Sequence, residues 1–543
     1  MIAKALVITL AGALCAVAAS PSIAQSTAST TGYANEFDRA LAGVFEAREK
    51  DWRDGAVVYQ VYVDRFAPPA NLEAKRALYP APKKLHAWTD LPVHGSYLPG
   101  AKVWSHEIDF WGGDLQSLRG KLDYVKDLGA DVLYLNPIAL AYTNHKYDSL
   151  DYREVSPEYG TRDDARELAQ DVHRHGMRIM LDGVFNHMGR NSAIFKQALD
   201  DTRSPYRNWF VFGPQYAGGA RSWALAENLP ELNLENPSVR DDLWNAHASV
   251  VRGWLRDGID GWRLDVAFDI GFKYLGELTQ AAHDEKPGSL MVGEIANFPK
   301  EWYPSVDGLI HFTLRQVILG VAAGRIDPAT GQRMIERIVQ DADYEHILKS
   351  WVYLDNHDTL RLATALPDPR ARRLAQVLQF TLPGSPNLYY GTELDMPGGD
   401  DPEMRAPMRW DLVKPGNAVL DWTKRLVALH KDNRALRVGN YRAITAGRLI
   451  GFERYTDRAA DTVVVLLNPS DKAVTDTVLV ANSKLMDGSR LVNLLADKGD
   501  ATGPADVRLH AALMDVTLPA HGFAVLKPDA APPGGYTNYK RVQ

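Results

Sequence analysis

The stretch Gly261-Trp-Arg-Leu-Asp-Val-Ala267 decides the fold, because it has the pattern of a buried strand that carries two charges. Arg263 and Asp265 alternate with its apolar residues, so their side chains point to the same side of the strand. A carboxylate on an apolar strand needs a partner, and an arginine two residues away supplies one. This pair is either a structural ion pair or a nucleophile, Asp265, that Arg263 holds ionised.

Seven further segments have the composition of strands, and helical stretches separate most of them. Alternating strands and helices predict a parallel sheet. Eight such units over this length favour a (β/α)8 TIM barrel over an open sheet. One of the helices is predicted over 238–257. The other predicted strands are Ala56–Phe66, Ala130–Ile138, Met177–Phe185, Leu290–Ile295, Gly308–Leu314, Trp351–Asn356 and Asn387–Tyr390.

Two regions depart from this alternation. Residues 188–235, after the third strand, are rich in Trp, Tyr, Gly and Pro, which predicts an inserted lobe with little regular structure. Short alternating segments over 436–527 predict a small antiparallel β domain, followed by a tail at 528–543. The barrel is then expected over 52–435, after an N-terminal extension at 25–51 that ends in a helix.

The first residues have the pattern of an export signal. Lys4 precedes the apolar run Ala5–Ala19, and Ser22-Ile-Ala24 is a small-x-small cleavage site, which predicts a signal peptide over 1–24. The run is short for a membrane anchor. We therefore expect a periplasmic or extracellular protein with no membrane span in the mature chain. The only cysteine, Cys15, lies inside this segment, and the net charge of -7 disfavours nucleic acid as a partner.

Three acids come at or just after the ends of apolar strands: Asp265, Glu294 and Asp358. Barrel closure brings the carboxyl ends of the strands around one mouth. Paired carboxylates are what retaining glycoside hydrolysis requires, one as nucleophile and the other as acid and base. The sequence therefore predicts a glycosidase site.

The sequence neighbours suggest a role for each acid. Arg263 should depress the pKa of Asp265 and keep it ionised as the nucleophile. Glu294 has no cation in sequence reach, and its apolar neighbours should raise its pKa, as a general acid requires. Asp358 would be a third acid that binds sugar hydroxyls.

Histidine and aromatic residues are also expected at the mouth. His187 and His357 end strands and could donate hydrogen bonds to sugar hydroxyls, although a histidine in such a place is often structural. Tyr147 is a candidate for stacking on a sugar face. Trp209 and Trp223 are weaker candidates, because most aromatic side chains belong to cores.

The sequence resembles the α-amylase family, glycoside hydrolase family 13. The family's core motifs appear in order over a likeness that covers about residues 52–527. They are Asp182-Gly-Val-Phe-Asn-His187, Leu229-Pro-Glu-Leu-Asn233, Gly261-Trp-Arg-Leu-Asp-Val-Ala267, Gly293-Glu-Ile-Ala296 and Leu354-Asp-Asn-His-Asp358.

The resemblance implies a barrel, a lobe inserted after its third strand, a C-terminal β-sandwich and a retaining mechanism on α-glucosidic bonds. By position, Asp265 would be the nucleophile, Glu294 the acid/base and Asp358 the transition-state stabiliser. The subsite for the reacting glucose would be lined by Arg263, His187, His357 and Tyr147, with Asp182 as structural support.

Some details resemble the cyclomaltodextrinase, neopullulanase and maltogenic amylase branch, notably Asn144-His-Lys-Tyr-Asp148 and Arg405-Ala-Pro-Met408. Residues 25–51 are too short for the N-terminal β domain that helps many members of this branch to dimerise. Ala296 stands where the branch often has Trp, and Glu231 where relatives have Asp or Lys. The resemblance makes Asn186 a candidate calcium ligand, and we expect that no cofactor is required.

Three functions remain open at this point. The first is a hydrolase of malto-oligosaccharides, cyclodextrins or related α-glucans. The second is a transglycosylase or isomerase of the same fold that acts on sucrose, maltose or trehalose. The third, a non-catalytic binding protein on an amylase scaffold, is disfavoured because all three acids are present.

Overall fold

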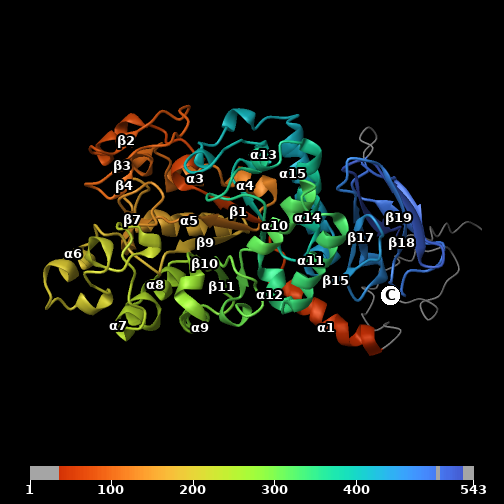
Figure 1. The fold of residues 1–543 in the computed structure, drawn as a ribbon, viewed down its shortest axis with the longest axis horizontal. Coiled ribbons are helices and arrows are strands. Elements are labelled where there is room, and N and C mark those ends of the chain that lie inside the picture. The colour runs from red at the N-terminus through yellow and green to blue at the C-terminus, as the bar shows by residue number, and fades with distance from the viewer. Residues whose placement is uncertain (1–35, 497–501, 530–543) are drawn as a thin grey trace, which may run out of the picture.

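The computed structural model describes residues 36–496 and 502–529. The predicted signal peptide and most of the predicted tail lie outside these residues. The described part consists of a barrel with lobes at one end and a β domain at the other (Figure 1).

The barrel is an eight-stranded parallel sheet in the order β12-β11-β10-β9-β6-β1-β14-β13. A parallel bridge between Ile310 and Trp351 joins the two outer strands and closes it. The predicted TIM barrel is therefore confirmed. Its strands are β1 (Val58–Val61), β6 (Val132–Leu135), β9 (Arg178–Gly183), β10 (Gly261–Leu264), β11 (Leu290–Gly293), β12 (Gly308–Leu309), β13 (Trp351–Tyr353) and β14 (Ser385–Tyr389).

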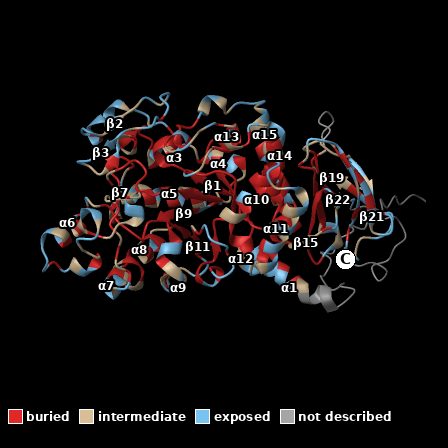
Figure 2. Ribbon diagram, in the orientation of Figure 1, coloured by how far each residue is buried: buried red, intermediate tan, exposed pale blue. Residues whose placement is uncertain are grey.

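Helices surround this sheet and bury their apolar faces against it (Figure 2). The principal ones are α3 (Leu115–Arg119), α4 (Leu122–Leu128), α5 (Arg162–Arg174), α8 (Val250–Arg256), α9 (Ala267–Glu285), α10 (Phe312–Ala322), α11 (Pro328–Asp341), α12 (Tyr344–Lys349), α14 (Pro369–Thr381) and α15 (Ala418–Asp432).

Three predicted elements differ from the structure. The strand predicted over Ala56–Phe66 ends at Val61, and a short helix, α2 (Val63–Phe66), follows it. The strand predicted over Gly308–Leu314 ends at Leu309, and α10 begins at Phe312. Short apolar runs do not distinguish a buried strand from a buried helix, which explains this error. The helix predicted over 238–257 is divided into α7 (Pro237–Arg240), a π-helical turn at Asp241–Asn245 and α8. The helical backbone is interrupted at Ala246, which has an extended conformation. Close by, Arg252 Nε donates to the carbonyl of Trp244 at 3.1 Å.

The inward-facing side chains of the strands change from apolar to polar towards the carboxyl end of the barrel. An apolar cluster that includes Val58, Val132 and Val292 fills the interior. Side chains alternate between the two faces of a strand, so the next inward position after Val292 is Glu294. The carboxyl ends of the strands thus carry polar side chains on a packed apolar base.

Loops at the carboxyl ends of the strands form the lobes at the left of Figure 1. Residues 67–110 contain two small sheets, β2 (Lys84–Leu85) with β5 (Asp109–Phe110), and β3 (Tyr97–Leu98) with β4 (Val103–Trp104). A hairpin of β7 (Ala139–Ala141) and β8 (Ser149–Val155) follows β6. The predicted inserted lobe contains one α-helix, α6 (Ala193–Asp200), and short 3-10 turns.

The C-terminal residues form an antiparallel sheet in the order β15-β16-β17-β22-β19-β20 and a separate β18-β21 pair, with an apolar core that includes Val464, Val478 and Val516. This agrees with the predicted β domain. The strands are β15 (Asn440–Ala443), β16 (Ile450–Tyr455), β17 (Val463–Leu467), β18 (Val474–Leu479), β19 (Arg490–Asn493), β20 (Asp506–Arg508), β21 (Leu513–Leu518) and β22 (Phe523–Pro528).

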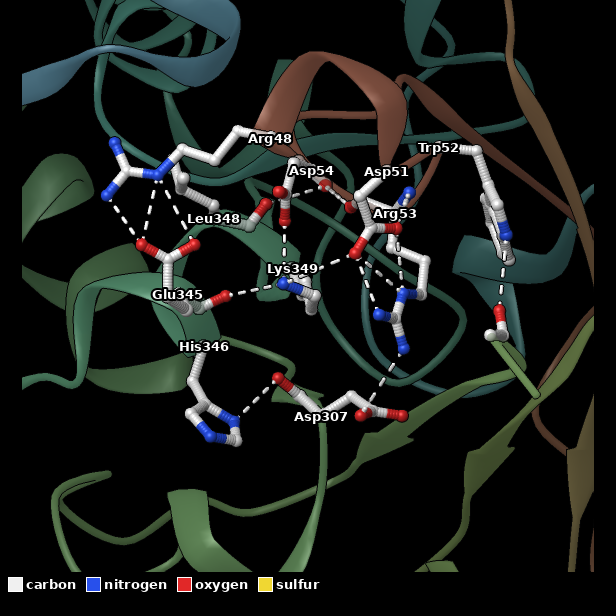
Figure 3. A network of polar contacts seen from close by, with 12 residues as sticks. Arg48, Asp51, Trp52, Arg53, Asp54, Asp307, Glu345, His346, Leu348 and Lys349 are labelled. Atoms are coloured by element: carbon white, nitrogen blue, oxygen red, sulfur yellow. Dashed lines mark hydrogen bonds and ion pairs between the residues drawn. The ribbon is translucent and has the colours of Figure 1, made fainter. Parts of the chain in front are cut away.

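Helix α1 (Glu36–Lys50) is held at the amino end of the barrel by the polar network of Figure 3. Arg48 Nη2 pairs with Glu345 Oε1 at 2.6 Å, and its Nη1 donates to Asn440 Oδ1 at 2.8 Å. Lys349 Nζ lies 2.8 Å from Asp54 Oδ1. The ion pair with Glu345 joins α1 to α12, and the hydrogen bond to Asn440, outside the labelled residues of Figure 3, joins α1 to β15.

Candidate active site

A single buried guanidinium, that of Arg263, stands at the centre of the acid cluster. Its Nη1 lies 2.7 Å from Asp182 Oδ1 and 2.9 Å from Asp265 Oδ1. Its Nη2 lies 2.9 Å from Glu294 Oε1. The structure therefore brings three of the sequence-predicted residues onto one cation.

No cation lies within sequence reach of Glu294, but Arg263 reaches it from the neighbouring strand. In the parallel pair of β10 and β11, Arg263 aligns with Val292, so the long arginine side chain reaches Glu294 two residues further along the next strand. Spacing along one strand does not reveal this neighbour, because the contact crosses between strands.

The prediction that the pKa of Asp265 is depressed was wrong. Burial raises the pKa of this carboxyl well above its ordinary value. Arg263 lowers it, but the nearby charges of Glu294, Asp182 and Asp358 raise it again. One arginine shared among several carboxylates does not offset their mutual repulsion and burial.

The residue after Asp265 adopts an unusual backbone conformation. Val266 has φ 46° and ψ 41°, the left-handed region that a β-branched residue rarely adopts. In this conformation its amide donates to Glu294 Oε2 at 2.9 Å. Strain of this kind costs about 1–3 kcal/mol and is concentrated at functional sites. Here it fixes the second oxygen of Glu294.

Tyr147 connects the acid cluster to the opposite side of the mouth. Its hydroxyl donates to Asp182 Oδ2 at 2.9 Å and lies 2.6 Å from His357 Nε2. Its ring stacks on that of His357 at 5.5 Å between centroids and 10° between planes. Tyr134 also donates to Asp182 Oδ2, at 2.6 Å. Asp182 thus accepts hydrogen bonds from two tyrosines and pairs with Arg263.

Asp358 is the accessible member of the three acids, with 41% of its side chain exposed. His357 Nε2 lies 2.9 Å from its Oδ2, and Arg405 Nη2 lies 3.2 Å from its Oδ1. Burial alone would raise the pKa of Asp358, but His357, Arg405 and Arg263 together lower it. Asp358 is therefore an ionised acceptor facing the open side of the site.

His187 is buried beside the nucleophile position. Its Nε2 lies 4.0 Å from Asp265 Oδ2. Burial lowers the pKa of His187 to about 3, so the ring is neutral over the ordinary pH range. Trp223 stacks on this ring, with 5.6 Å between centroids. Trp209 does not join the site, because it is buried in the inserted lobe and donates to Ser238 Oγ.

Sequence reasoning did not assign a role to four polar residues around the mouth. Gln60 contacts His357 Nδ1 at 2.9 Å, and Asn136 donates to the Tyr147 hydroxyl at 3.1 Å. Arg405 holds Asp358 and also pairs with Asp401 Oδ1 at 2.9 Å. Gln60 and Asn136 were detectable in principle as polar residues at the ends of apolar strands.

Asn186, the candidate calcium ligand, lies beside His187 at the edge of the site. Its side-chain nitrogen lies 3.4 Å from His187 Nδ1, and its carbonyl accepts from the amide of Leu232. Over residues 36–496 and 502–529, no group of three or more His, Cys, Asp or Glu side chains is placed to hold a metal ion.

With this geometry in view, comparison with known proteins identifies the class. The α-amylase catalytic domain matches residues 60–438. The chain therefore belongs to the α-amylase family and is a glycoside hydrolase.

The relatives include members of the branch that the sequence resembles. A cyclomaltodextrinase from Geobacillus thermopakistaniensis is 31% identical over 503 residues, which are 88% of this chain and 77% of that protein. An intracellular maltogenic amylase from Bacillus subtilis is 34% identical over 411 residues, 73% of this chain and 64% of that protein. The solved cyclic α-maltosyl-(1→6)-maltose hydrolase from Arthrobacter globiformis is 29% identical, with a TM-score of 0.72, and the match covers 88% of this chain and 99% of that one.

Proposed function

We propose that this protein is a retaining α-glucan hydrolase that cleaves mainly α-1,4 bonds in malto-oligosaccharides, cyclodextrins or related glucans. The observation that carries the proposal is the placement of Asp265 and Glu294 on two nitrogens of one buried guanidinium. Retaining glycosidases need two carboxyl groups roughly 5–5.5 Å apart, and a shared arginine favours such closeness.

In the proposed first step, Asp265 attacks the anomeric carbon while Glu294 gives its proton to the leaving oxygen. The glycosidic bond breaks and an ester bond to Asp265 forms. In the second step, Glu294 takes a proton from water, the water oxygen attacks the same carbon, and Asp265 leaves. Two inversions give a product with the α configuration.

This cycle needs one proton shared by the two carboxyl groups. The raised pKa of Asp265 supports such a proton, because burial and like charges favour keeping one carboxyl in the cluster neutral. The proposed first step requires this proton on Glu294 and Asp265 ionised. Val266 then holds Oε2 of Glu294 through its amide, while Arg263 stabilises the ionised Asp265.

The other residues of the mouth are proposed to bind the reacting glucose. Asp358 would accept hydrogen bonds from sugar hydroxyls and favour ring distortion. His357 and neutral His187 would contact hydroxyls from two sides, and the ring of Tyr147 would stack on the sugar face. Each of these side chains is held by contacts already described, which limits the reorganisation needed on binding.

The test is product analysis by proton NMR during the first minutes of reaction, with maltoheptaose, β-cyclodextrin and pullulan supplied separately. Release of α-anomers from any of them is expected. Early release of β-anomers would overturn the retaining mechanism. Turnover of sucrose, maltose or trehalose, with none of the three glucans cleaved, would favour a transglycosylase or isomerase instead.

We also propose export, on the basis of the N-terminal pattern that ends at Ala24. In the described residues, no helix is long and apolar enough to cross a membrane. Mass spectrometry of the protein recovered from outside the cytoplasm should give an N-terminus at Gln25. Recovery of the uncleaved chain from the cytoplasm alone would contradict export.

A further inference from the structure

The hairpin of β3 and β4 presents two aromatic side chains to solvent. Tyr97 and Trp104 are directly paired across its two strands, so they lie side by side on one face. They are 43% and 46% exposed, respectively. On the other face of the hairpin, Val103 is buried in a small core with Ile108 and Phe110. The hairpin thus has a buried face that stabilises it and an aromatic face that packing does not explain.

A chain of polar contacts joins this aromatic face to Asp358. Trp104 stacks on His106, with 6.1 Å between centroids and 25° between planes. His106 Nε2 lies 3.3 Å from Asp401 Oδ2, and Asp401 pairs with Arg405. Arg405 then holds Asp358 at 3.2 Å. The amide of Gly95 donates to His106 Nδ1, which orients the ring in this chain.

A second route leads from the same hairpin to Tyr147. The amide of Trp104 donates to Glu107 Oε2 at 2.5 Å, and Glu107 Oε1 lies 3.3 Å from His145 Nε2. His145 Nδ1 accepts from the amide of Tyr147 at 3.1 Å. Two independent routes therefore fix the position of the aromatic face relative to the site.

The hairpin is also connected to the inserted lobe on the other side. Lys102 lies in the turn between β3 and β4, and its Nζ pairs with Glu227 Oε2 of the inserted lobe at 3.1 Å. Figure 2 shows β3 as a largely exposed element at the end of the molecule that carries the lobes. The aromatic pair therefore has an open approach and a position set by its neighbours.

We propose that Tyr97 and Trp104, the aromatic ledge, form an additional sugar-binding subsite for glucose units of an α-glucan chain beyond the reacting one. Pyranose rings have an apolar face of C–H groups that stacks on aromatic rings, and a Tyr–Trp pair supplies such a surface together with polar atoms at its edge. A linear glucan is the occupant favoured by continuity with the site, since contacts run from Trp104 to Asp358 and Tyr147. This inference rests on the proposed function and extends it to substrate length.

The ledge is tested with Trp104→Ala, Tyr97→Ala and the conservative Trp104→Phe. Each is combined with Glu294→Gln to prevent turnover, and maltoheptaose binding is measured by calorimetry. We expect Trp104→Ala to raise the Kd for maltoheptaose by about 10-fold, because one aromatic contact with the sugar is lost. Trp104→Phe keeps an aromatic ring and should raise this Kd by about 3-fold or less. Met486→Ala, an exposed apolar truncation in the C-terminal domain, is the matched control and should not change Kd.

Kinetics of the same substitutions in the active enzyme separate the ledge from the catalytic centre. Loss of kcat/KM in Trp104→Ala should be at least about 5-fold greater for maltoheptaose than for p-nitrophenyl α-glucoside, which has a single sugar ring. Equal losses on both substrates, or an unchanged Kd for maltoheptaose, would overturn the ledge. So would failure of the Glu294→Gln protein to bind maltoheptaose. Binding that depends on Trp104, without any hydrolysis by the wild-type enzyme, would overturn the proposed function and retain the ledge.

Discussion

Arg263 Nη2 lies 2.9 Å from Glu294 Oε1, while Nη1 of the same side chain contacts Asp265 and Asp182. One cation therefore orients the proposed nucleophile and the proposed acid/base together. A planar guanidinium can do this because its nitrogens point in fixed, separate directions.

The first prediction concerns this shared cation. Arg263→Lys keeps the charge but provides one nitrogen, which cannot contact Asp265 and Glu294 in the same geometry. We expect kcat/KM on maltoheptaose to fall by about 100-fold or more. The control is Arg76→Lys, a change in the exposed pair with Glu73. Near-normal kinetics in Arg263→Lys would mean that the bridging geometry is dispensable.

The second prediction concerns the charge of Asp265. Asp265→Asn should reduce turnover by about 10,000-fold or more, because the covalent step is lost. Folding raises the pKa of Asp265, so this carboxyl stabilises the fold at low pH and that contribution is lost as pH rises through the folded-state pKa. At neutral pH, Asp265→Asn should therefore have a Tm about 1–3 °C higher than the wild type, because the neutral amide is buried without a charge.

Thermal melts over a pH series check this reasoning. The Tm difference between Asp265→Asn and wild type should decline as pH falls, because the wild-type carboxyl then becomes neutral in both states. A Tm lower than wild type at neutral pH would show that the ion pair with Arg263 outweighs burial and repulsion.

The third prediction separates acid catalysis from nucleophilic attack. Glu294→Gln cannot protonate a leaving oxygen, so it should slow maltoheptaose cleavage by about 1,000-fold. An activated aryl glucoside with a good leaving group needs little protonation in the first step, and the burst of phenolate should persist. Stopped-flow absorbance measures this burst. If the burst rate falls as much as maltoheptaose turnover, Glu294 is not the acid.

The fourth prediction concerns acid stability. His187 is buried with a pKa of about 3, below its ordinary value of 6.5. A lowered folded-state pKa contributes stability above about pH 6.5 that is lost as pH falls towards 3. Each unit below 6.5 costs about 1.4 kcal/mol, so His187→Asn should flatten the decline in unfolding free energy between pH 6 and 4.

Urea unfolding at several pH values measures this decline. His510→Asn is the matched control, because His510 is almost fully exposed and should leave the slope unchanged. An identical slope in wild type and His187→Asn would show that His187 does not determine the acid limit.

The fifth prediction concerns calcium: within residues 36–496 and 502–529, no group of three or more His, Cys, Asp or Glu side chains is placed to hold a metal ion. Dialysis against EDTA should leave kcat/KM on maltoheptaose and Tm unchanged, and calcium added back should have no effect. Activity that falls with EDTA and returns with calcium would contradict this prediction and would require a metal site built largely from backbone carbonyl oxygens and water.

Much of the fold was predictable from local pattern. Strand and helix periods identified the eight barrel strands, and Asp265, Glu294 and Asp358 stood out as acids at or just beyond strand ends. The errors in assigning secondary structure were also confined to short segments. Phe312 begins a helix within an apolar run that reads as strand, and the β3–β4 hairpin lies in a segment that reads as loop.

The electrostatics of the site could not be predicted in the same way. Arg263 and Glu294 are 31 residues apart in the printed sequence and meet because β10 and β11 are neighbours in register. The direction of the Asp265 pKa shift reverses for the same reason, since Glu294, Asp182 and Asp358 come from three other strands or their following loops.

The sequence by itself determined the alternating strands, the polar residues at their ends and the family to which they belong, because these depend on local periodicity and on motifs. Tertiary structure alone decided which charges share Arg263, which residues hold Asp358 and where Trp104 faces. Those features depend on distances between strands and loops, and such distances exist only after the barrel has closed.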